Sequence, residues 1–266
     1  MNTLERRIVL YFALIFLYLP AIVLVVYSFN DSRLMLTWQG FTLKWYVQLF
    51  TSPETGAALK NTLIVSFSAT AVSVVLGALL GIGMHLYQFP GKRMVEALFY
   101  LPIIIPDIIM AIALLAFYVL IHLTLGYLSI ILAHIAFQIS FIAFVVKSRM
   151  QDFPRSIIEA ARDLGATPFQ ALYRVILPLA RPGVIAGALI AFTLSVDDFL
   201  ITYFTAGVGT STLPLRIYAL VKRGVTPDIN ALSTLILLAT LALLYAGLKL
   251  LHKPGEKHRQ NNSTAK

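Results

Sequence analysis

Six apolar runs of membrane-crossing length constrain this chain more than any other feature of its sequence. They lie at about 8–29, 62–85, 98–121, 127–147, 183–206 and 231–248. About 20 apolar residues are needed to cross the hydrocarbon core of a bilayer, so each run predicts a transmembrane helix. Hydrophobic residues make up 59% of the chain and charged residues only 12%, which is not the composition of a soluble domain. We therefore expect an all-α integral membrane protein with six transmembrane helices.

The runs divide the chain into three parts. Residues 1–61 contain the first helix and an outward loop, residues 62–251 contain a transmembrane core, and residues 252–266 form a polar tail. The first run is too long for the core of a signal peptide and is not followed by a small-residue cleavage site, so we expect a permanent helix.

Lysine and arginine predict the orientation, because positive residues near helix ends are retained on the cytoplasmic side. Most of the 21 gather at both termini, near residue 92 and between residues 147 and 181. We expect these segments, both termini included, to face the cytoplasm. Topology and anionic lipid headgroups account for the net charge of +9, so no nucleic-acid partner is expected.

Two longer outward loops, at about 30–61 and 207–230, carry aromatic residues and prolines, among them Trp38, Trp45 and Tyr218. Aromatic side chains commonly anchor a protein at the membrane interface. The alternative is a docking surface for a partner outside the cytoplasm, and the sequence leaves both interpretations open.

A charged, amphipathic segment separates the fourth and fifth apolar runs. Asp152 is expected to cap a short helix over 155–164, which Gly165 ends in the left-handed conformation. A second short helix is expected to begin at Pro168 and to stop at Pro178. Together the two helices would form a compact folded element at the cytoplasmic surface.

The same segment resembles the membrane-spanning subunits of bacterial ABC importers of the binding-protein-dependent type. Their signature is Glu-Ala-Ala, a glycine four residues after the last alanine, and a later Ile-x-Pro. The matching positions here are Glu159, Ala160, Ala161, Gly165, Ile176 and Pro178, with Arg162 and Asp163 offering further charges for partner contacts. The resemblance implies coupling helices that sit in a cleft of a separate ATP-hydrolysing subunit. The alternative is an inert amphipathic turn that lies on the lipid headgroups.

The chain is not expected to be an enzyme. A phosphate-binding loop would need Gly-x-x-x-x-Gly-Lys-Ser/Thr, and the sequence does not contain this pattern. It also lacks cysteine, a His-Glu-x-x-His pattern and a serine elbow, so we expect no catalytic or metal-binding residues and no bound cofactor. ATP and magnesium would be used by the partner subunit.

Three carboxylates at membrane depth are the candidates for a solute path. Asp107 lies in the third apolar run, and Asp197 and Asp198 lie in the fifth. A carboxylate at the centre of a membrane helix costs about 2.5–3.5 kcal/mol on insertion scales, so such residues generally have a function. Pro106 precedes Asp107, which is also how a restarted helix would begin.

On a continuous fifth helix, polar residues would share one face: Ser195, Asp198, Thr202 and Thr205. Asp198 is therefore favoured over Asp197 for lining a path. Aromatic residues such as Tyr203 lie close by, and an anionic, aromatic-flanked stripe suits an organic amine. The alternative is that Asp197 or Asp198 hydrogen-bonds a neighbouring helix and only stabilises the bundle.

His134 and Gln138 form another small polar patch, four residues apart in the fourth run. We expect them to make hydrogen bonds between helices, and we assign them no transport role.

The stretches 194–204, 212–218 and 226–231 resemble the permease subunits of spermidine/putrescine importers. This implies a bacterial inner-membrane complex with a second permease, two ATP-binding subunits and a periplasmic substrate-binding protein. Alternating access would then carry the polyamine through the membrane. An ABC permease for a different small solute is the alternative. A secondary transporter is less favoured, because the sequence shows no inverted repeat with matching broken helices.

Overall fold

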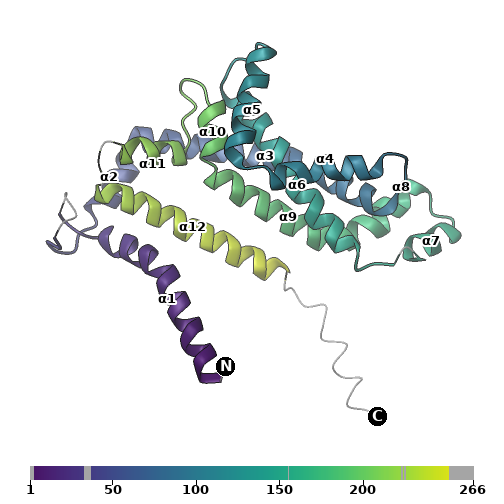
Figure 1. Ribbon diagram of the computed structural model, residues 1–266, viewed down its shortest axis with the longest axis horizontal. Coiled ribbons are helices and arrows are strands. Elements are labelled where there is room, and N and C mark those ends of the chain that lie inside the picture. Colours follow the sequence, from purple (N-terminus) through teal and green to yellow (C-terminus); the bar gives the residue numbers. More distant parts are fainter. Residues whose placement is uncertain (1–2, 33–36, 155, 223, 225, 252–266) are drawn as a thin grey trace. The chain divides into compact units, whose positions relative to one another are not determined.

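The computed structural model describes residues 3–32, 37–154, 156–222, 224 and 226–251. Within these residues the chain is helical, apart from loops and an isolated bridge between Asn30 and Phe41 (Figure 1). The helices are α1 (Thr3–Tyr27), α2 (Lys44–Thr51), α3 (Pro53–Leu86), α4 (Lys92–Ile104), α5 (Asp107–Leu120), α6 (Tyr127–Met150), α7 (Ser156–Asp163), α8 (Pro168–Ala171), η1 (Leu172–Ile176, a π-helical turn), α9 (Leu177–Asp197), α10 (Leu200–Thr205), α11 (Leu213–Val221) and α12 (Pro227–Leu251). The predicted polar tail, 252–266, lies outside the described residues.

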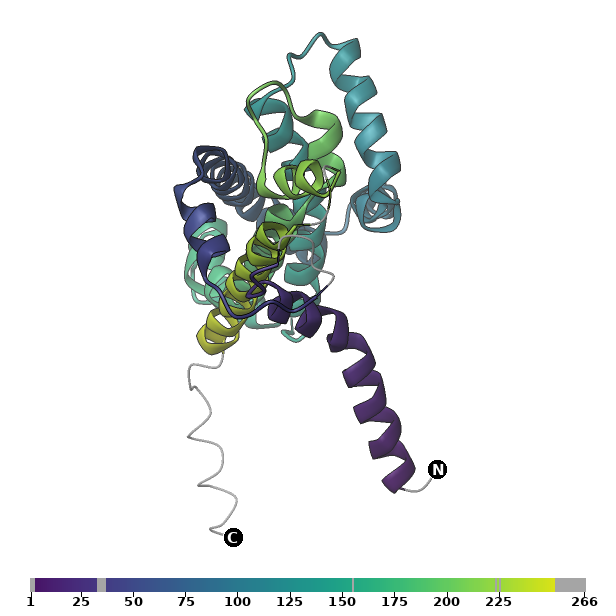
Figure 2. The ribbon, with the colours of Figure 1, turned by 90° about the vertical axis from the view of Figure 1, so that its left-hand side faces the viewer.

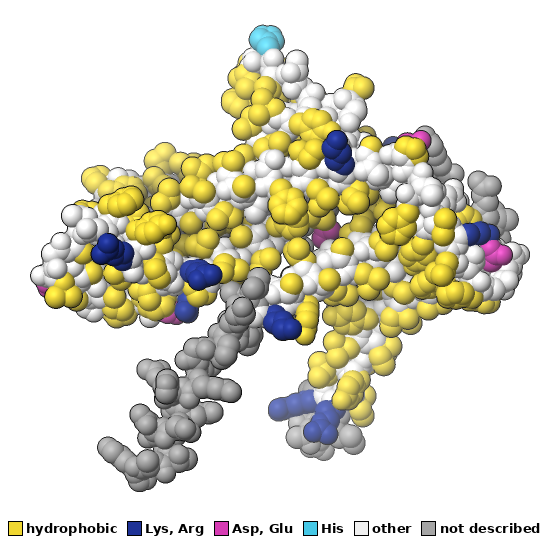
Figure 3. Space-filling model, turned by 180° about the vertical axis from the view of Figure 1, so that it is seen from behind, with side chains coloured by type: hydrophobic (Ala, Val, Ile, Leu, Met, Phe, Trp, Pro, Cys, Tyr) yellow, Lys and Arg dark blue, Asp and Glu magenta, His cyan; other side chains and the backbone are white. Residues whose placement is uncertain are grey.

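Among the described residues, five stretches are long and apolar enough to cross a membrane without interruption. They contain α1, α3, α6, α9 and α12. Helices α4 and α5 together are apolar enough for a further, broken span or a re-entrant loop, and they meet at a bend of 110°. The bend can be followed in Figure 1 and, from the side, in Figure 2. Hydrophobic side chains cover most of the face shown in Figure 3, as a lipid environment requires.

The chain divides into two compact units, and the first comprises residues 1–61 and 211–240. Its core joins α2, α3 and α11 to α12 through a set of buried apolar side chains: Trp45, Leu49, Ala58, Leu213, Ala231 and Leu232. The indole Nε1 of Trp45 also donates a hydrogen bond of 2.8 Å to the carbonyl oxygen of Asn30. Trp45 is thus a buried structural residue of this unit.

The second unit comprises residues 62–210 and 241–266. Its centre is the packing of α3, α6 and α9, because Ile142 and Val146 of α6 are fully buried in a cluster with Ala78 of α3 and Ala180 of α9. The helices approach closely: a Cβ atom on Gly81 would lie 2.6 Å from the carbonyl oxygen of Ala143. Small residues at such contacts allow close backbone packing where lipid offers no hydrophobic driving force.

A second cluster in this unit packs α10 against α5 and α6. Its buried members are Ala111, Tyr118, Ala133, Phe137 and Ile201. Figure 1 shows α10 beside α5. This cluster lies next to the two interruptions in the membrane spans that form the candidate site.

Two of the six predicted helices differ from expectation, because each is broken. The third run, expected at 98–121, is interrupted at Ile105 and Pro106, and the fifth, expected at 183–206, is interrupted at Asp198 and Phe199. Hydrophobicity alone does not reveal such interruptions, since apolar residues continue on both sides of each break.

Candidate functional site

The break in the third span follows from its proline. Pro106 has no backbone N–H to donate and restricts the preceding residue to extended conformations, and Ile105 indeed has a ψ of 133°. The helix restarts at Asp107, which confirms the restarted-helix alternative. The Asp107 side chain is exposed and has no hydrogen-bond or ion-pair partner among the described residues.

The break in the fifth span separates two adjacent carboxylates. Asp197 is the last residue of α9, and α10 begins at Leu200. Asp197 is exposed and, within the described part of the chain, its carboxylate has no partner. The Asp198 side chain, by contrast, is only 9% exposed. The continuous polar stripe expected on one helix is therefore wrong, because the helix does not continue through Asp198.

The Asp198 carboxylate is occupied by contacts inside the chain. Its Oδ2 accepts hydrogen bonds of 2.7 Å from both the backbone N–H and the hydroxyl of Thr202, and its Oδ1 accepts one of 3.4 Å from the Ile201 N–H. It thus satisfies backbone donors at the start of α10 as a helix cap does. His134 Nε2 lies 3.3 Å from Oδ2. These contacts favour the alternative in which Asp198 stabilises the bundle.

His134 is the residue whose importance the sequence interpretation missed. Its side chain is fully buried, and it contacts Ser195 Oγ at 2.7 Å through Nδ1 and Thr202 Oγ1 at 3.0 Å through Nε2. The expected hydrogen bonds between helices are therefore present for His134. They are absent for Gln138, whose amide atoms are buried without a hydrogen-bond partner in the described residues. An isolated histidine within an apolar helix was the available signal.

The predicted path residues thus fall into two groups. Ser195, Asp198 and Thr202 are drawn together around His134. The exposed group consists of Asp107, Asp197 and Tyr203, of which Tyr203 packs its ring at 5.5 Å from that of Phe199.

The second candidate site is the segment between the fourth and fifth spans. Helix α7 contains no buried residue, and Glu159, Ala160, Arg162 and Asp163 are all exposed, while Ala161 is half-buried. Gly165 ends the helix as expected, with a φ of +84° and a hydrogen bond of 3.1 Å from the Ala166 N–H to the Ala161 carbonyl oxygen. The start differs from expectation, because Asp152 pairs with Arg149 at 2.8 Å. Arg155, the expected first residue of the helix, lies outside the described residues.

The second short helix begins as expected and ends differently. Thr167 Oγ1 accepts a hydrogen bond from the Gln170 N–H, and Gln170 Oε1 accepts one from the Thr167 N–H, which together form a capping box. Pro178 does not stop the helix. The π-helical turn at 172–176 leads directly into α9, and Pro178 occupies its first turn, where its missing N–H is tolerated.

The inner side of this segment packs on the core of the second unit. Ile176 is buried in the cluster of α3, α6 and α9, and Ile158 and Leu172 pack against that cluster. The outer side carries three protruding apolar residues: Leu164 is 89% exposed, Phe169 73% and Tyr173 67%. The segment is therefore fixed on one side and presents an apolar patch with charges on the other.

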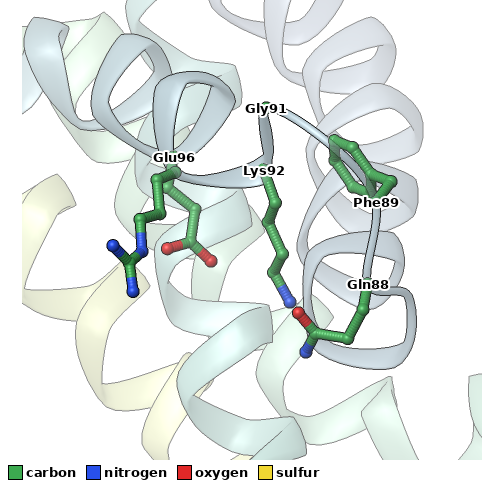
Figure 4. A pocket seen from close by; sticks show the side chains of 6 residues that line it. Gln88, Phe89, Gly91, Lys92 and Glu96 are labelled. Atoms are coloured by element: carbon green, nitrogen blue, oxygen red, sulfur yellow. The ribbon is translucent and has the colours of Figure 1, made fainter.

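A polar pocket of about 520 Å³ lies at the turn between α3 and α4. Figure 4 shows Lys92 and Gln88 with their polar ends close together in this pocket. The Lys92 amine donates a hydrogen bond of 2.9 Å to the Tyr87 carbonyl oxygen, and Glu96 is paired with Lys147 at 2.9 Å. The pocket contains neither acidic break, so it is not part of the candidate path. The described residues contain no group of three or more histidine or acidic side chains able to hold a metal ion.

Comparison with known proteins identifies the family of this chain. Residues 73–253 match the model of a family described as the binding-protein-dependent transport system inner membrane component. The chain belongs to this family. It is therefore a multi-pass inner membrane component of a transport system and not an enzyme.

Individual relatives of this inner membrane component support the assignment. It is 40% identical to the spermidine/putrescine transport system permease protein PotC of Haemophilus influenzae over 229 residues, which are 86% of this chain and 89% of the relative. It is 37% identical to the putrescine transport system permease protein PotI of Escherichia coli over 239 residues, 87% of this chain and 85% of the relative. The fold is that of a bacterial ABC transporter involved in alginate import, with a TM-score of 0.72 at 20% identity over 95% of this chain and 98% of the other.

Proposed function

We propose that this transport component forms the membrane path for a polyamine such as spermidine or putrescine. The observation that carries the proposal is Asp197, an exposed carboxylate at the break of the fifth span that no described residue neutralises. An unpaired carboxylate at membrane depth is costly, and it becomes favourable where a cation or water meets it. The 40% identical relative is named for spermidine and putrescine transport, which agrees with a cationic solute.

Asp107 gives the path a second acid. Both Asp107 and Asp197 stand at the interruption of a membrane span, where irregular backbone is tolerated only if it is buried in protein or lines a cavity. The two breaks flank the cluster in which α5 and α10 pack together. Two separated carboxylates suit a solute with an amine at each end, with Tyr203 as an aromatic neighbour for a cationic group.

The segment from Glu159 to Pro178 would dock on a separate ATPase. Its protruding apolar residues and exposed charges give it the character of a protein interface, whereas its inner side is fixed to α3, α6 and α9. A push on the outer side would therefore move those spans as a body. We infer that this segment and both termini face the cytoplasm, in keeping with the distribution of lysine and arginine.

The complete importer would contain a second permease, two ATP-binding subunits and a periplasmic substrate-binding protein. ATP and magnesium would be bound by the ATPase, and membrane lipids would surround the spans. The apolar window of α1 is unburied, which leaves its surface for lipid or for the second permease.

The test is uptake by the complex reconstituted in vesicles with its partner subunits. Replacing Asp197→Asn should lower spermidine uptake per ATP hydrolysed by about tenfold or more, the loss expected for one charge-assisted hydrogen bond. Glu54→Gln is the matched control, because it removes an exposed carboxylate far along the sequence from either break and should leave uptake unchanged. Undiminished uptake by Asp197→Asn, or preferred uptake of an anionic solute, would refute the proposal.

A further inference from the structure

One buried imidazole contacts both sides of the break in the fifth span. His134 of α6 reaches Ser195, which lies in α9 before the break, and it reaches Asp198 and Thr202, which lie at the break and after it. The exposed fraction of the His134 side chain is 1%. Among the described residues, His134 is the titratable side chain that contacts Asp198.

The hydrogen bonds determine where the imidazole carries its proton. Thr202 has one hydroxyl hydrogen, and it is donated to Asp198 Oδ2 at 2.7 Å. Thr202 Oγ1 must therefore accept from His134 at 3.0 Å, which requires a hydrogen on Nε2. On its other side, His134 Nδ1 lies within hydrogen-bonding distance of the Ser195 hydroxyl, at 2.7 Å. Every polar atom of this group is then satisfied.

A second contact ties the far end of α10 to the same helix. The Ser129 hydroxyl of α6 lies 2.7 Å from the carbonyl oxygen of Thr205, and Ile201 packs in the cluster with Phe137 of α6. Helix α10 is thus held on α6 at both ends. The segment that follows the break is therefore anchored to α6, whereas Asp197 belongs to α9, before the break.

We propose that His134 is a positioning residue for solute transfer: it holds Asp198 inside the protein as the cap of α10, so that the neighbouring Asp197 is the carboxylate presented to the solute. This rests on the proposed function, because it concerns the same path. The imidazole thus holds Asp198 in contacts within the chain, and Asp197 remains available to the solute.

The test compares three variants in the reconstituted complex. His134→Leu introduces an apolar side chain of similar size that cannot make the polar contact with Asp198. It should lower solute uptake per ATP hydrolysed by about tenfold. His134→Gln places an amide N–H where Nε2 lies and should restore most of the loss. Gln138→Leu is the matched control, since Gln138 is equally buried on the same helix without a hydrogen-bond partner in the described residues, and it should transport normally.

A merely structural role predicts a different pattern. It would lower the amount of assembled complex and the ATP hydrolysis together, with the uptake per ATP unchanged, and this result would overturn the proposal. The double variant His134→Leu/Asp198→Asn should be no worse than Asp198→Asn alone, because the imidazole acts through that carboxylate. Losses that multiply would show independent effects and would also overturn it.

A labelling experiment separates this proposal from the identity of the solute. The chain contains no cysteine, so Ile201→Cys provides a single thiol at a buried position just after the break. His134→Leu should raise its reaction rate with a small thiol reagent by about tenfold, and Gln138→Leu should not. An unchanged rate would show that His134 does not hold α10, whereas a raised rate with no amine uptake would refute only the polyamine assignment.

Discussion

Gly165 offers the sharpest test of the proposal that the segment from Glu159 to Pro178 docks on an ATPase. Its φ of +84° is a left-handed conformation, and a Cβ added there would meet no atom within 4 Å. Replacement by valine therefore adds no clash, and its cost is conformational, about 1–2 kcal/mol for a residue forced into this region. That energy corresponds to a roughly 5- to 30-fold smaller ratio of native to non-native conformations at the end of α7.

The assay is solute-stimulated ATP hydrolysis by the reconstituted complex, measured while the ATPase subunit is titrated. Gly165→Val should need more ATPase for half-maximal stimulation, by up to about 30-fold, because fewer permease molecules present the docking conformation. Gly165→Asn is the control, since asparagine tolerates left-handed backbone and should stay close to the parent protein. If both variants titrate like the parent, the geometry at Gly165 does not matter for coupling and the reasoning fails.

Two further predictions concern packing within the second unit. Gly81→Ala should lower the stability of the protein in detergent, because its Cβ would lie 2.6 Å from the Ala143 carbonyl oxygen and overpacking costs about 1–3 kcal/mol. The control is Gly83→Ala on the same helix, which should leave the stability unchanged because its Cβ would meet open space. Equal melting temperatures of the two variants would contradict the prediction. Lys147→Met should destabilise the α4–α6 contact by about 1.5–3 kcal/mol, because Glu96 loses a partner at 2.9 Å. Adding Glu96→Gln should recover much of that loss in the same unfolding assay, and no recovery would argue against the pair.

Local sequence patterns predicted the elements that depend on neighbouring residues. The apolar runs predicted the membrane-crossing stretches, and Gly165 and Thr167–Pro168 predicted the end of α7 and the start of α8, because caps are decided within a few residues. Pro178 was misjudged for a related reason. A proline ends a helix only if the preceding turns cannot adapt, and the π-helical turn before it accommodates the ring.

The candidate path depended on contacts that no local pattern contains. A helical projection made Asp198 the better path residue, since it assumed one continuous helix over 183–206. The partner that decides the matter, His134, lies more than 60 residues earlier in the chain.

The sequence by itself determined that this chain crosses the membrane repeatedly and carries a capped, charged segment between its fourth and fifth spans. Both follow from the hydrophobic effect and from backbone hydrogen bonding within single segments. Only the tertiary structure decided which carboxylate is internal and which is exposed. That choice arises where α6, α9 and α10 meet, because the buried His134 and Thr202 contact the Asp198 carboxylate, whereas no described residue pairs with that of Asp197.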